Sequence, residues 1–470
     1  MTPSLFGTDG IRGLANGKPM TAEIILAVGR ATAQLLAERR LSETSTQNTL
    51  RTGPLKIVIG KDTRQSGYMV ESALVAGLCS MGAKVFLVGP LPTPAIAFIT
   101  QSMRADGGIM ITASHNPFPY NGLKIFDSGG RKLSVKHQEQ IEYGVAHPEH
   151  LGQLAPYDKV GKAVRIDDAL GRYIVNLKNI FLEGATLDGL KIVLDCAHGA
   201  AYKVGPIVLE ELGASVIAMN CSPNGTNINH ECGAIAPQAM AKRVLEEKAD
   251  MGFALDGDGD RLVVADETGA LWDGDDLLFV CARGLLREGA LAHNTVVTTQ
   301  LSNRGLAQSL APLGGRVVYT PVGDRFVVDQ MQVEGACLGG ENSGHVICGR
   351  HATTADGLGA ALTVLAEFQK GAKPMSQLRK GLERLPQVSR NLAIQHRRDF
   401  TSLRSFQNVL SKVEESLDHA GRVLVRYSGT EPLVRIMVEG KDRDHIEKCV
   451  EELSSTLAAE LNVASPWNPS

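Results

Sequence analysis

The chain has 470 residues, of which 43% are hydrophobic and 21% are charged, an ordinary balance for a globular protein of about two to four domains. The net charge of −3 and the lack of a dense basic run predict no nucleic-acid partner. The eight cysteines lack CxxC or zinc-type spacing, the N-terminus lacks signal-peptide features, and no apolar run could span a bilayer. We therefore expect a cytoplasmic protein with reduced thiols and no membrane contact.

A pattern of strands, polar loops and helical stretches occurs three times along the chain. Each unit opens with a β-branched run and a polar loop, at KIVIGKDTR (56–64), KIVLDCAHGAA (191–201) and TVVTTQLSNRG (295–305). A second strand follows an apolar residue and a glycine, at 81–89, 212–220 and 313–321. A third strand ends in a polar loop, at GGIMITASHNP (107–117), MGFALDGDGDR (251–261) and GACLGGENSGH (335–345). Strands that alternate with helices indicate βαβ units whose strands are covered on both faces.

These repeats predict three related α/β domains with mixed sheets, followed by a smaller α+β domain. In RVLVR and LVRIMVEG, alternation indicates an antiparallel pair of strands, and residues 442–461 have helical spacing. The boundaries we expect are 1–165, 166–275, 276–385 and 386–470. Because ligands bind outside the carboxyl ends of strands in such sheets, the polar loops should share one cleft.

The stretch MITASHNPFPYNGLK (110–124) presents Ser114 in a loop directly after a strand. A loop serine commonly does no more than hydrogen-bond to nearby backbone. The same stretch ends at Lys124, for which an ordinary surface lysine at the start of a strand is an alternative interpretation. The stretch alone therefore does not decide what Ser114 does.

The loop LDGDGDR places Asp256, Asp258 and Asp260 at alternate positions. Carboxylates this close repel one another unless a cation lies between them, and oxygen ligands suit Mg²⁺ or Ca²⁺. An EF-hand loop is an alternative, with Glu267 at its twelfth position. However, Arg261 occupies the position that needs glycine, and the flanking segments resemble strands. A solvated acidic turn is the other alternative.

The segment VRYSGTEPLVR is a candidate anion site. A turn at Ser428, Gly429 and Thr430 can expose backbone N–H groups. Arg426 and Arg435 can each bind an anion through bidentate hydrogen bonds. A hairpin turn with surface arginines is the alternative interpretation.

Three further glycine-containing loops carry polar side chains. GGENSGH places Glu341, Ser343 and His345 at alternate positions, which suits recognition of sugar hydroxyls, and His345 could also move protons. A lone loop histidine is more often an ordinary surface residue. FGTDGIRG and TPVGDRF contribute Arg12 and Arg325, either of which could instead form a structural ion pair.

Taken in order, TASHNPFPYNGLK, DGDGDR, GGENSGH and RYSGTEP resemble the α-D-phosphohexomutase superfamily over nearly the whole chain. FGTDGIRG, GGENSGHVI and RYSGTEPLVRIMVEG look most like its phosphoglucosamine mutase branch. The resemblance implies four domains around a central cleft, with Ser114 carrying a transferable phosphate. It implies an Mg²⁺ site formed by phosphorylated Ser114, Asp256, Asp258 and Asp260. It also implies a phosphate-binding loop at Arg426 to Thr430 with Arg435, and a sugar loop at Glu341 to Ser343.

The implied reaction interconverts glucosamine 6-phosphate and glucosamine 1-phosphate through a bisphosphate, and so supplies amino-sugar and cell-wall precursors. In it Lys124 is the first candidate for the general acid and base and His345 the second, while Arg12 and Arg261 steady the phosphoryl group. A phosphomannomutase or phosphoglucomutase of the same mechanism remains an alternative, as does a non-catalytic sugar-phosphate or calcium-binding protein. We expect a hexosamine phosphate substrate and a monomer or homodimer. The stretch 41–54 should be a surface loop without a role in the chemistry.

Overall fold

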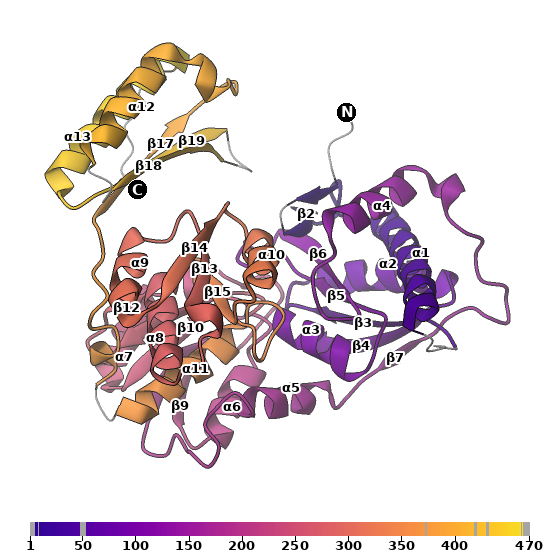
Figure 1. Cartoon of the computed structure of the whole chain (residues 1–470). Helices are drawn as coiled ribbons and strands as arrows, with labels where there is room; N and C mark the ends of the chain where they lie inside the picture. Colours follow the sequence, from indigo (N-terminus) through magenta and orange to yellow (C-terminus); the bar gives the residue numbers. More distant parts are fainter. Residues whose placement is uncertain are drawn as a thin grey trace. The chain divides into compact units, whose positions relative to one another are not determined.

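The computed structural model (Figure 1) describes residues 5–7, 9–47, 53–371, 374–417, 421–428, 432–461 and 463, with backbone alone for 43–47. The chain forms two compact units. The first comprises Met1–Ser302 and Leu313–Lys380, and the second comprises Asn303–Pro312 and Gly381–Ser470. The first unit contains three mixed sheets, and the second contains an antiparallel sheet.

The three sheets of the first unit repeat one arrangement, in which three parallel strands are followed by an antiparallel one. The central strands are β3 (Lys56–Lys61), β8 (Lys191–Asp195) and β13 (Thr295–Thr299). On one side lie β4 (Lys84–Pro90), β9 (Ser215–Met219) and β14 (Arg316–Thr320). On the other lie β5 (Gly107–Ile111), β10 (Met251–Leu255) and β15 (Leu338–Gly340). The predicted threefold repeat is therefore confirmed down to the order of its strands.

The third parallel strand of each sheet turns back into an antiparallel neighbour. These neighbours are β6 (Tyr120–Asp127), β11 (Leu262–Asp266) and β16 (Val346–Cys348). The connections into them are residues 112–119, 256–261 and 341–345, which are the three polar loops predicted to carry chemistry. The loops thus occupy equivalent positions in three copies of one topology.

Short strands extend two of these sheets. In the first sheet they are β1 (Phe6–Gly7), β2 (Gly10–Leu14) and β7 (Ala163–Arg165), and in the second β12 (Leu271–Trp272). Every residue of β5 and β10 is buried, as expected for strands covered on both faces. Helices α2 and α3 both pack against β3 and β5.

Helices connect the strands of the first unit. They are α1 (Ala22–Gln47), α2 (Gly67–Ser80), α3 (Thr93–Ser102), α4 (Val135–Ala146), α5 (Ala169–Lys178), α6 (Val204–Glu211), α7 (Gln238–Glu247), α8 (Gly274–Arg287), α10 (Asp324–Glu334) and α11 (Gly357–Gly371). Local sequence explains some of their ends. Asp273 and Asp276 form a reciprocal capping box that satisfies N–H groups at the start of α8. No helix in the described part of the chain is both long and apolar enough to cross a membrane.

The prediction of a surface loop over 41–54 is wrong for its first half. Helix α1 continues through residues 41–47, while 48–52 lie outside the described residues. The segment contains no glycine or proline before Gly53 and Pro54, so nothing in it breaks a helix that is already formed.

The second unit is built around a sheet of order β17 (Gln387–Ala393), β19 (Leu433–Glu439) and β18 (Arg422–Tyr427). Its helices are α9 (Arg304–Leu310), α12 (Arg404–Ser416) and α13 (Arg443–Leu461). The predicted antiparallel pair and final helix are confirmed, and Ile446, Val450, Leu453 and Leu457 are buried. Strand β17 and helix α12 were not predicted, although Phe406, Val409, Leu410 and Val413 recur at helical spacing in α12 and pack into the core of this unit.

Candidate active site

Ser114 lies in the connection between β5 and β6, and its side chain reaches the acidic loop of the second sheet. Its φ of 51° is in the left-handed region, which a serine adopts only where its surroundings hold it there. The residue is 1% exposed, and its hydroxyl donates a hydrogen bond of 2.7 Å to Oδ2 of Asp256. The structure therefore presents a hydroxyl of the first repeat to a carboxylate of the second.

Arg64, a residue without a sequence signal of its own, holds the backbone of the serine loop. Its side chain is fully buried, and its Nε donates to Oδ2 of Asp62 at 2.8 Å. The two terminal nitrogens donate to four backbone carbonyls, those of Ser114 at 2.9 Å, Asn116 at 2.8 Å, Pro117 at 2.6 Å and Tyr120 at 3.0 Å. All four N–H groups of the terminal nitrogens are thus used to order this loop, while Nε–H anchors the guanidinium to Asp62.

A side chain of the second repeat grips the same loop. Asn229 donates its amide to the carbonyls of Ser114 at 2.8 Å and Asn116 at 3.0 Å, the two that Nη2 of Arg64 also contacts. Gly257 packs against this junction, where a Cβ would lie only 2.6 Å from the Ser114 carbonyl oxygen. The serine loop and the acidic loop therefore meet backbone to backbone, which excludes a side chain at position 257.

Asp256, Asp258 and Asp260 are all buried, and each offers a carboxylate oxygen within 4.8 Å of the others. The alternative of a solvated acidic turn is therefore wrong. The EF-hand alternative is wrong as well, because strands β10 and β11 flank the loop. Oδ1 of Asp258 and Oδ1 of Asp260 are buried without a hydrogen-bond partner among the described residues. This set of hard, partly unsatisfied oxygens fits a divalent cation such as Mg²⁺.

The charges of the three aspartates explain why a cation suits them. Burial, together with Asp260 and Asp258, raises the pKa of Asp256 well above its ordinary value. Burial also acts to raise the pKa of Asp260, but Lys124 and His345 outweigh it and hold that pKa well below the ordinary value. A divalent ion would offset the mutual repulsion that now makes Asp256 hard to ionise.

Lys124 is not a surface residue, since it is only 2% exposed on β6. Its Nζ donates to Oδ2 of Asp258 at 2.8 Å and to Oδ2 of Asp260 at 2.7 Å. Burial alone would lower the pKa of Lys124, but these two carboxylates and Asp9 raise it well above its ordinary value. The lysine predicted to act as acid and base therefore lies directly against the candidate metal ligands.

Six titratable side chains from all three repeats of the first unit form a closed ring of ion pairs. In order around the ring they are Asp9, Lys132, Asp324, His345, Asp260 and Lys124. Nε2 of His345 lies 3.6 Å from Oδ2 of both Asp324 and Asp260, and Nζ of Lys124 lies 3.5 Å from Oδ2 of Asp9. Burial acts to lower the pKa of His345, but Asp260, Asp324 and Glu341 raise it overall. With His345 protonated, the charges alternate in sign around the whole ring.

The predicted sugar loop between β15 and β16 is attached to the second sheet. Leu262 donates its amide to the carbonyl of Gly344 at 3.0 Å, and Gly274 donates to that of Asn342 at 3.0 Å. Oε1 of Glu341 accepts from the amide of Gly323 at 3.1 Å. Oγ of Ser343 is buried without a hydrogen-bond partner among the described residues, so it is available to a ligand.

The arginines of the first unit have different surroundings. Arg261 follows the acidic loop, and Asp256 and Asp260 raise its pKa although burial acts to lower it. Arg12 forms an ion pair with Asp9. Arg325 lies 3.8 Å from Asp329 on its own helix, which supports a structural role for it.

In the second unit, Arg426 of β18 lies directly opposite Arg435 of β19. Burial and the charge of Arg435 both lower the pKa of Arg426. Like charges directly opposite in a sheet repel, so an anion bound between these guanidinium groups would be favourable.

The turn after β18 is described only at its first residue. Ser428 is 3% exposed, its amide donates to the carbonyl of Leu433 at 2.8 Å, and its own carbonyl accepts from Nη2 of Arg397 at 2.6 Å. Arg397 therefore adds a third cation that sequence reasoning missed. Gly429 and Thr430 lie outside the described residues.

The comparisons with known proteins agree with this architecture. Four models of phosphoglucomutase/phosphomannomutase domains match consecutive segments: alpha/beta/alpha domains I, II and III at residues 3–150, 171–269 and 273–385, and the C-terminal domain at 379–455. The chain belongs to the phosphoglucomutase/phosphomannomutase family.

Among its relatives are proteins named phosphoglucosamine mutase. The one from Syntrophotalea carbinolica is 50% identical over 464 residues, covering 98% of this chain and 99% of its own. The one from Anaeromyxobacter sp. (strain Fw109-5) is 50% identical over 461 residues, covering 97% and 96%. A Burkholderia thailandensis family protein of known structure is 24% identical, with a TM-score of 0.80 and 98% of both chains covered, which shows the shared fold.

Proposed function

We propose that this chain interconverts glucosamine 6-phosphate and glucosamine 1-phosphate, with Ser114 as the carrier of the phosphoryl group. The phosphoglucosamine mutases that are 50% identical to nearly the whole chain support this substrate. The observation that carries the role of Ser114 is its buried hydrogen bond of 2.7 Å to Asp256. A binding protein would have no use for a hydroxyl held in a strained conformation against a candidate metal ligand.

Asp256, Asp258 and Asp260 would hold Mg²⁺, together with a phosphate oxygen on Ser114. When bound, the ion supplies charge neutralisation and Lewis-acid polarisation of the phosphoryl group. In the present arrangement, Lys124 occupies one oxygen of Asp258 and one of Asp260. The Oδ1 atoms of these two aspartates are left without partners, so Lys124 and the ion would share the two carboxylates, and Nζ would lie next to the metal site.

The reaction then takes place in two matching transfers. Ser114, once phosphorylated, gives its phosphoryl group to the free hydroxyl of the sugar phosphate: the Oγ–P bond breaks and a sugar O–P bond forms. Lys124 is the first candidate to accept the hydroxyl proton and His345 the second. Either would do so in its neutral form, so the carboxylates that raise both pKa values would have to be offset by the bound cation. In the second transfer, Ser114 takes the other phosphoryl group from the bisphosphate, and the freed sugar oxygen recovers a proton.

The remaining polar residues would bind the substrate and stabilise charge. Arg12 and Arg261 would face the anionic phosphoryl oxygens in transit. Glu341 and Ser343 would hydrogen-bond sugar hydroxyls, for which the unpartnered Oγ of Ser343 is suited. Arg426, Ser428 and Arg435 would bind the phosphate that is not being transferred, as would Gly429 and Thr430.

Removing the hydroxyl of Ser114 tests its proposed role as phosphoryl carrier. Ser114→Ala should nearly abolish turnover of glucosamine 6-phosphate and remove the phosphoryl-enzyme species from the intact-mass spectrum, while the fold persists. Ser134→Ala, which removes only the cap of α4, is the matched control and should keep full activity. Normal turnover by purified Ser114→Ala would overturn the carrier role. Assays of glucose and mannose phosphates alongside would detect a different preferred substrate.

A further inference from the structure

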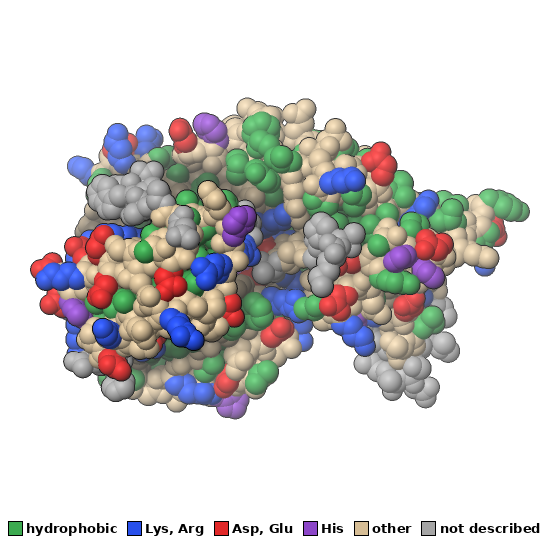
Figure 2. All heavy atoms as spheres, turned by 90° about the horizontal axis from the view of Figure 1, so that it is seen from above, with side chains coloured by type: hydrophobic (Ala, Val, Ile, Leu, Met, Phe, Trp, Pro, Cys, Tyr) green, Lys and Arg blue, Asp and Glu red, His purple; other side chains and the backbone are tan. Residues whose placement is uncertain are grey.

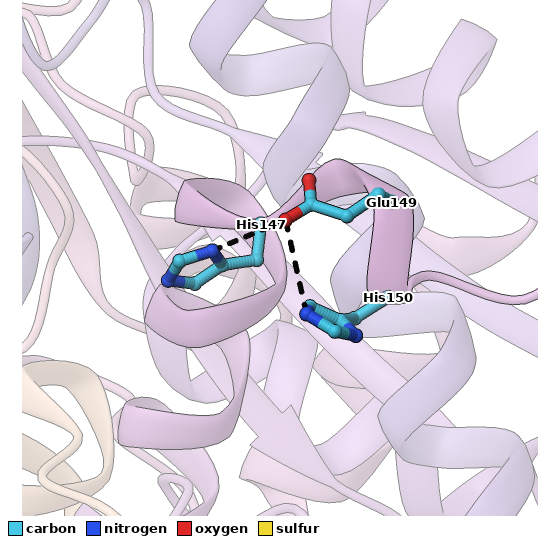
Figure 3. A group of neighbouring side chains, drawn as sticks. All are labelled: His147, Glu149 and His150. Carbon is cyan, nitrogen blue, oxygen red and sulfur yellow. Dashed lines mark hydrogen bonds and ion pairs between the residues drawn. The ribbon is translucent and has the colours of Figure 1, made fainter.

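A second group of metal-binding side chains lies outside the candidate active site, where α4 ends. His147 is the C-cap of α4, and Pro148 opens a single 3₁₀ turn, η1 (Pro148–His150). This tight turn brings His147, Glu149 and His150 together, as Figure 3 shows. Each offers a ligand atom within 4.8 Å of the other two.

We propose that His147, Glu149 and His150 form a surface site for a divalent transition-metal ion, Zn²⁺ being the best fit. Two imidazole nitrogens and one carboxylate oxygen are a donor set typical of zinc, whereas Mg²⁺ prefers oxygen alone. The chain would then hold two sites of different chemistry, because the three buried aspartates offer only oxygen. This inference does not depend on the proposed mutase function.

The distances between donor atoms support the proposal. Bonds of about 2.0–2.1 Å place tetrahedral ligands about 3.3 Å apart. Oε1 of Glu149 lies 3.3 Å from Nδ1 of His147 and 3.7 Å from Nε2 of His150. Both distances to the glutamate oxygen are therefore within a few tenths of an ångström of that spacing, and every pair of donors lies within 4.8 Å.

The three side chains are also held in place and open to solvent. The ring of Tyr143 packs against both imidazoles, at 4.6 Å from His147 and 5.5 Å from His150 between ring centres. The amide of His150 donates to the carbonyl of His147 at 2.9 Å. Within the described residues, Glu149 forms ion pairs with these two histidines and with no lysine or arginine. The side chains are 46%, 65% and 56% exposed in chain order, so water can complete the coordination.

The experiment measures Zn²⁺ bound per chain by equilibrium dialysis in excess Mg²⁺, which would occupy the aspartate site. Wild type should bind one more Zn²⁺ than the double variant His147→Ala with His150→Ala. Glu149→Gln should weaken that extra site at least about tenfold, because a neutral amide is a poor substitute for a carboxylate ligand. The control His230→Ala removes an exposed histidine elsewhere and should bind as wild type does.

A second readout is thermal. Zn²⁺ in excess Mg²⁺ should raise the Tm of wild type but not that of the double variant, since an ion that binds the folded state stabilises it. All these variants should keep normal turnover of glucosamine 6-phosphate in Mg²⁺. Equal Zn²⁺ binding by wild type and the double variant would overturn the proposal and leave a plain histidine–glutamate hydrogen bond.

Discussion

Replacing Arg64 with lysine should displace Ser114 without changing the residues that bind substrate, so it should lower kcat and leave KM nearly unchanged. Arg64 donates to four carbonyls between Ser114 and Tyr120 and is anchored by Asp62. Lysine keeps the charge that Asp62 needs, so the variant avoids an unpaired buried carboxylate, which would cost about 3–5 kcal/mol. What it loses is the planar fork that reaches several acceptors at once.

The size of the effect follows from the bonds that are lost. A single ammonium nitrogen cannot reach both pairs of carbonyls, so we expect at least two of the four bonds to break. With a charged donor each is worth roughly 1.5–3 kcal/mol, which gives roughly 3–6 kcal/mol before water or Asn229 compensates. A serine loop released by about 1 Å could cost about 100-fold in turnover. Substrate binding should change little, because Arg64 is not among the residues proposed to touch the substrate.

The assay is steady-state conversion of glucosamine 6-phosphate, with Tm measured on the same samples. We expect Arg64→Lys to lower kcat by about 100-fold and to change KM by less than about threefold. Arg283→Lys is the matched control, because Arg283 also donates to two backbone carbonyls, those of Leu378 and Lys380, away from the serine loop. A folded Arg64→Lys enzyme with kcat close to wild type would refute the positioning argument.

Three further outcomes test other parts of the site. Asp258→Asn keeps the side-chain shape but removes a charge, so turnover should fall at least about tenfold and half-saturation should need more Mg²⁺; full activity of EDTA-treated wild type would contradict the metal assignment. Lys132→Met removes the cation between the carboxylates of Asp9 and Asp324. The repulsion between these two carboxylates should lower both Tm and kcat, and added salt, which screens it, should restore part of the Tm. Arg426→Ala should raise KM at least about tenfold with partial rescue by lysine, and an unchanged KM would place the phosphate elsewhere.

The sequence predicted the repeated topology because the signal is local and occurs three times. Each β-branched run became a strand, and each polar loop occupies the same turn of its sheet. Asp256, Asp258 and Asp260 were found because three carboxylates at alternate positions repel one another unless a cation lies between them. The helix over 41–47 was missed because its polar residues have no amphipathic period, although none of them ends a helix.

Arg64 and Lys132 could not be found in this way, because what defines them is distance in the fold rather than spacing in the chain. Lys132 contacts Asp9 and Asp324, which are 123 and 192 positions away in the chain. Asn229 contacts Ser114, which is 115 positions away. Acidic and basic side chains are scattered over the face that Figure 2 shows, so one more lysine in the sequence carries no signal by itself.

The ring from Asp9 through His345 to Lys124 can nevertheless be explained by electrostatics. Three carboxylates held close together near the proposed phosphoryl site, two of them buried, need cations between them, and here two lysines and one histidine alternate with the acids. Each cation is shared by acids on different segments, so the ring couples the placement of the sugar loop to that of the acidic loop. Lys132 is not among the proposed substrate-binding residues. Replacing it should nevertheless change the position and charge state of His345, because both side chains pair with Asp324.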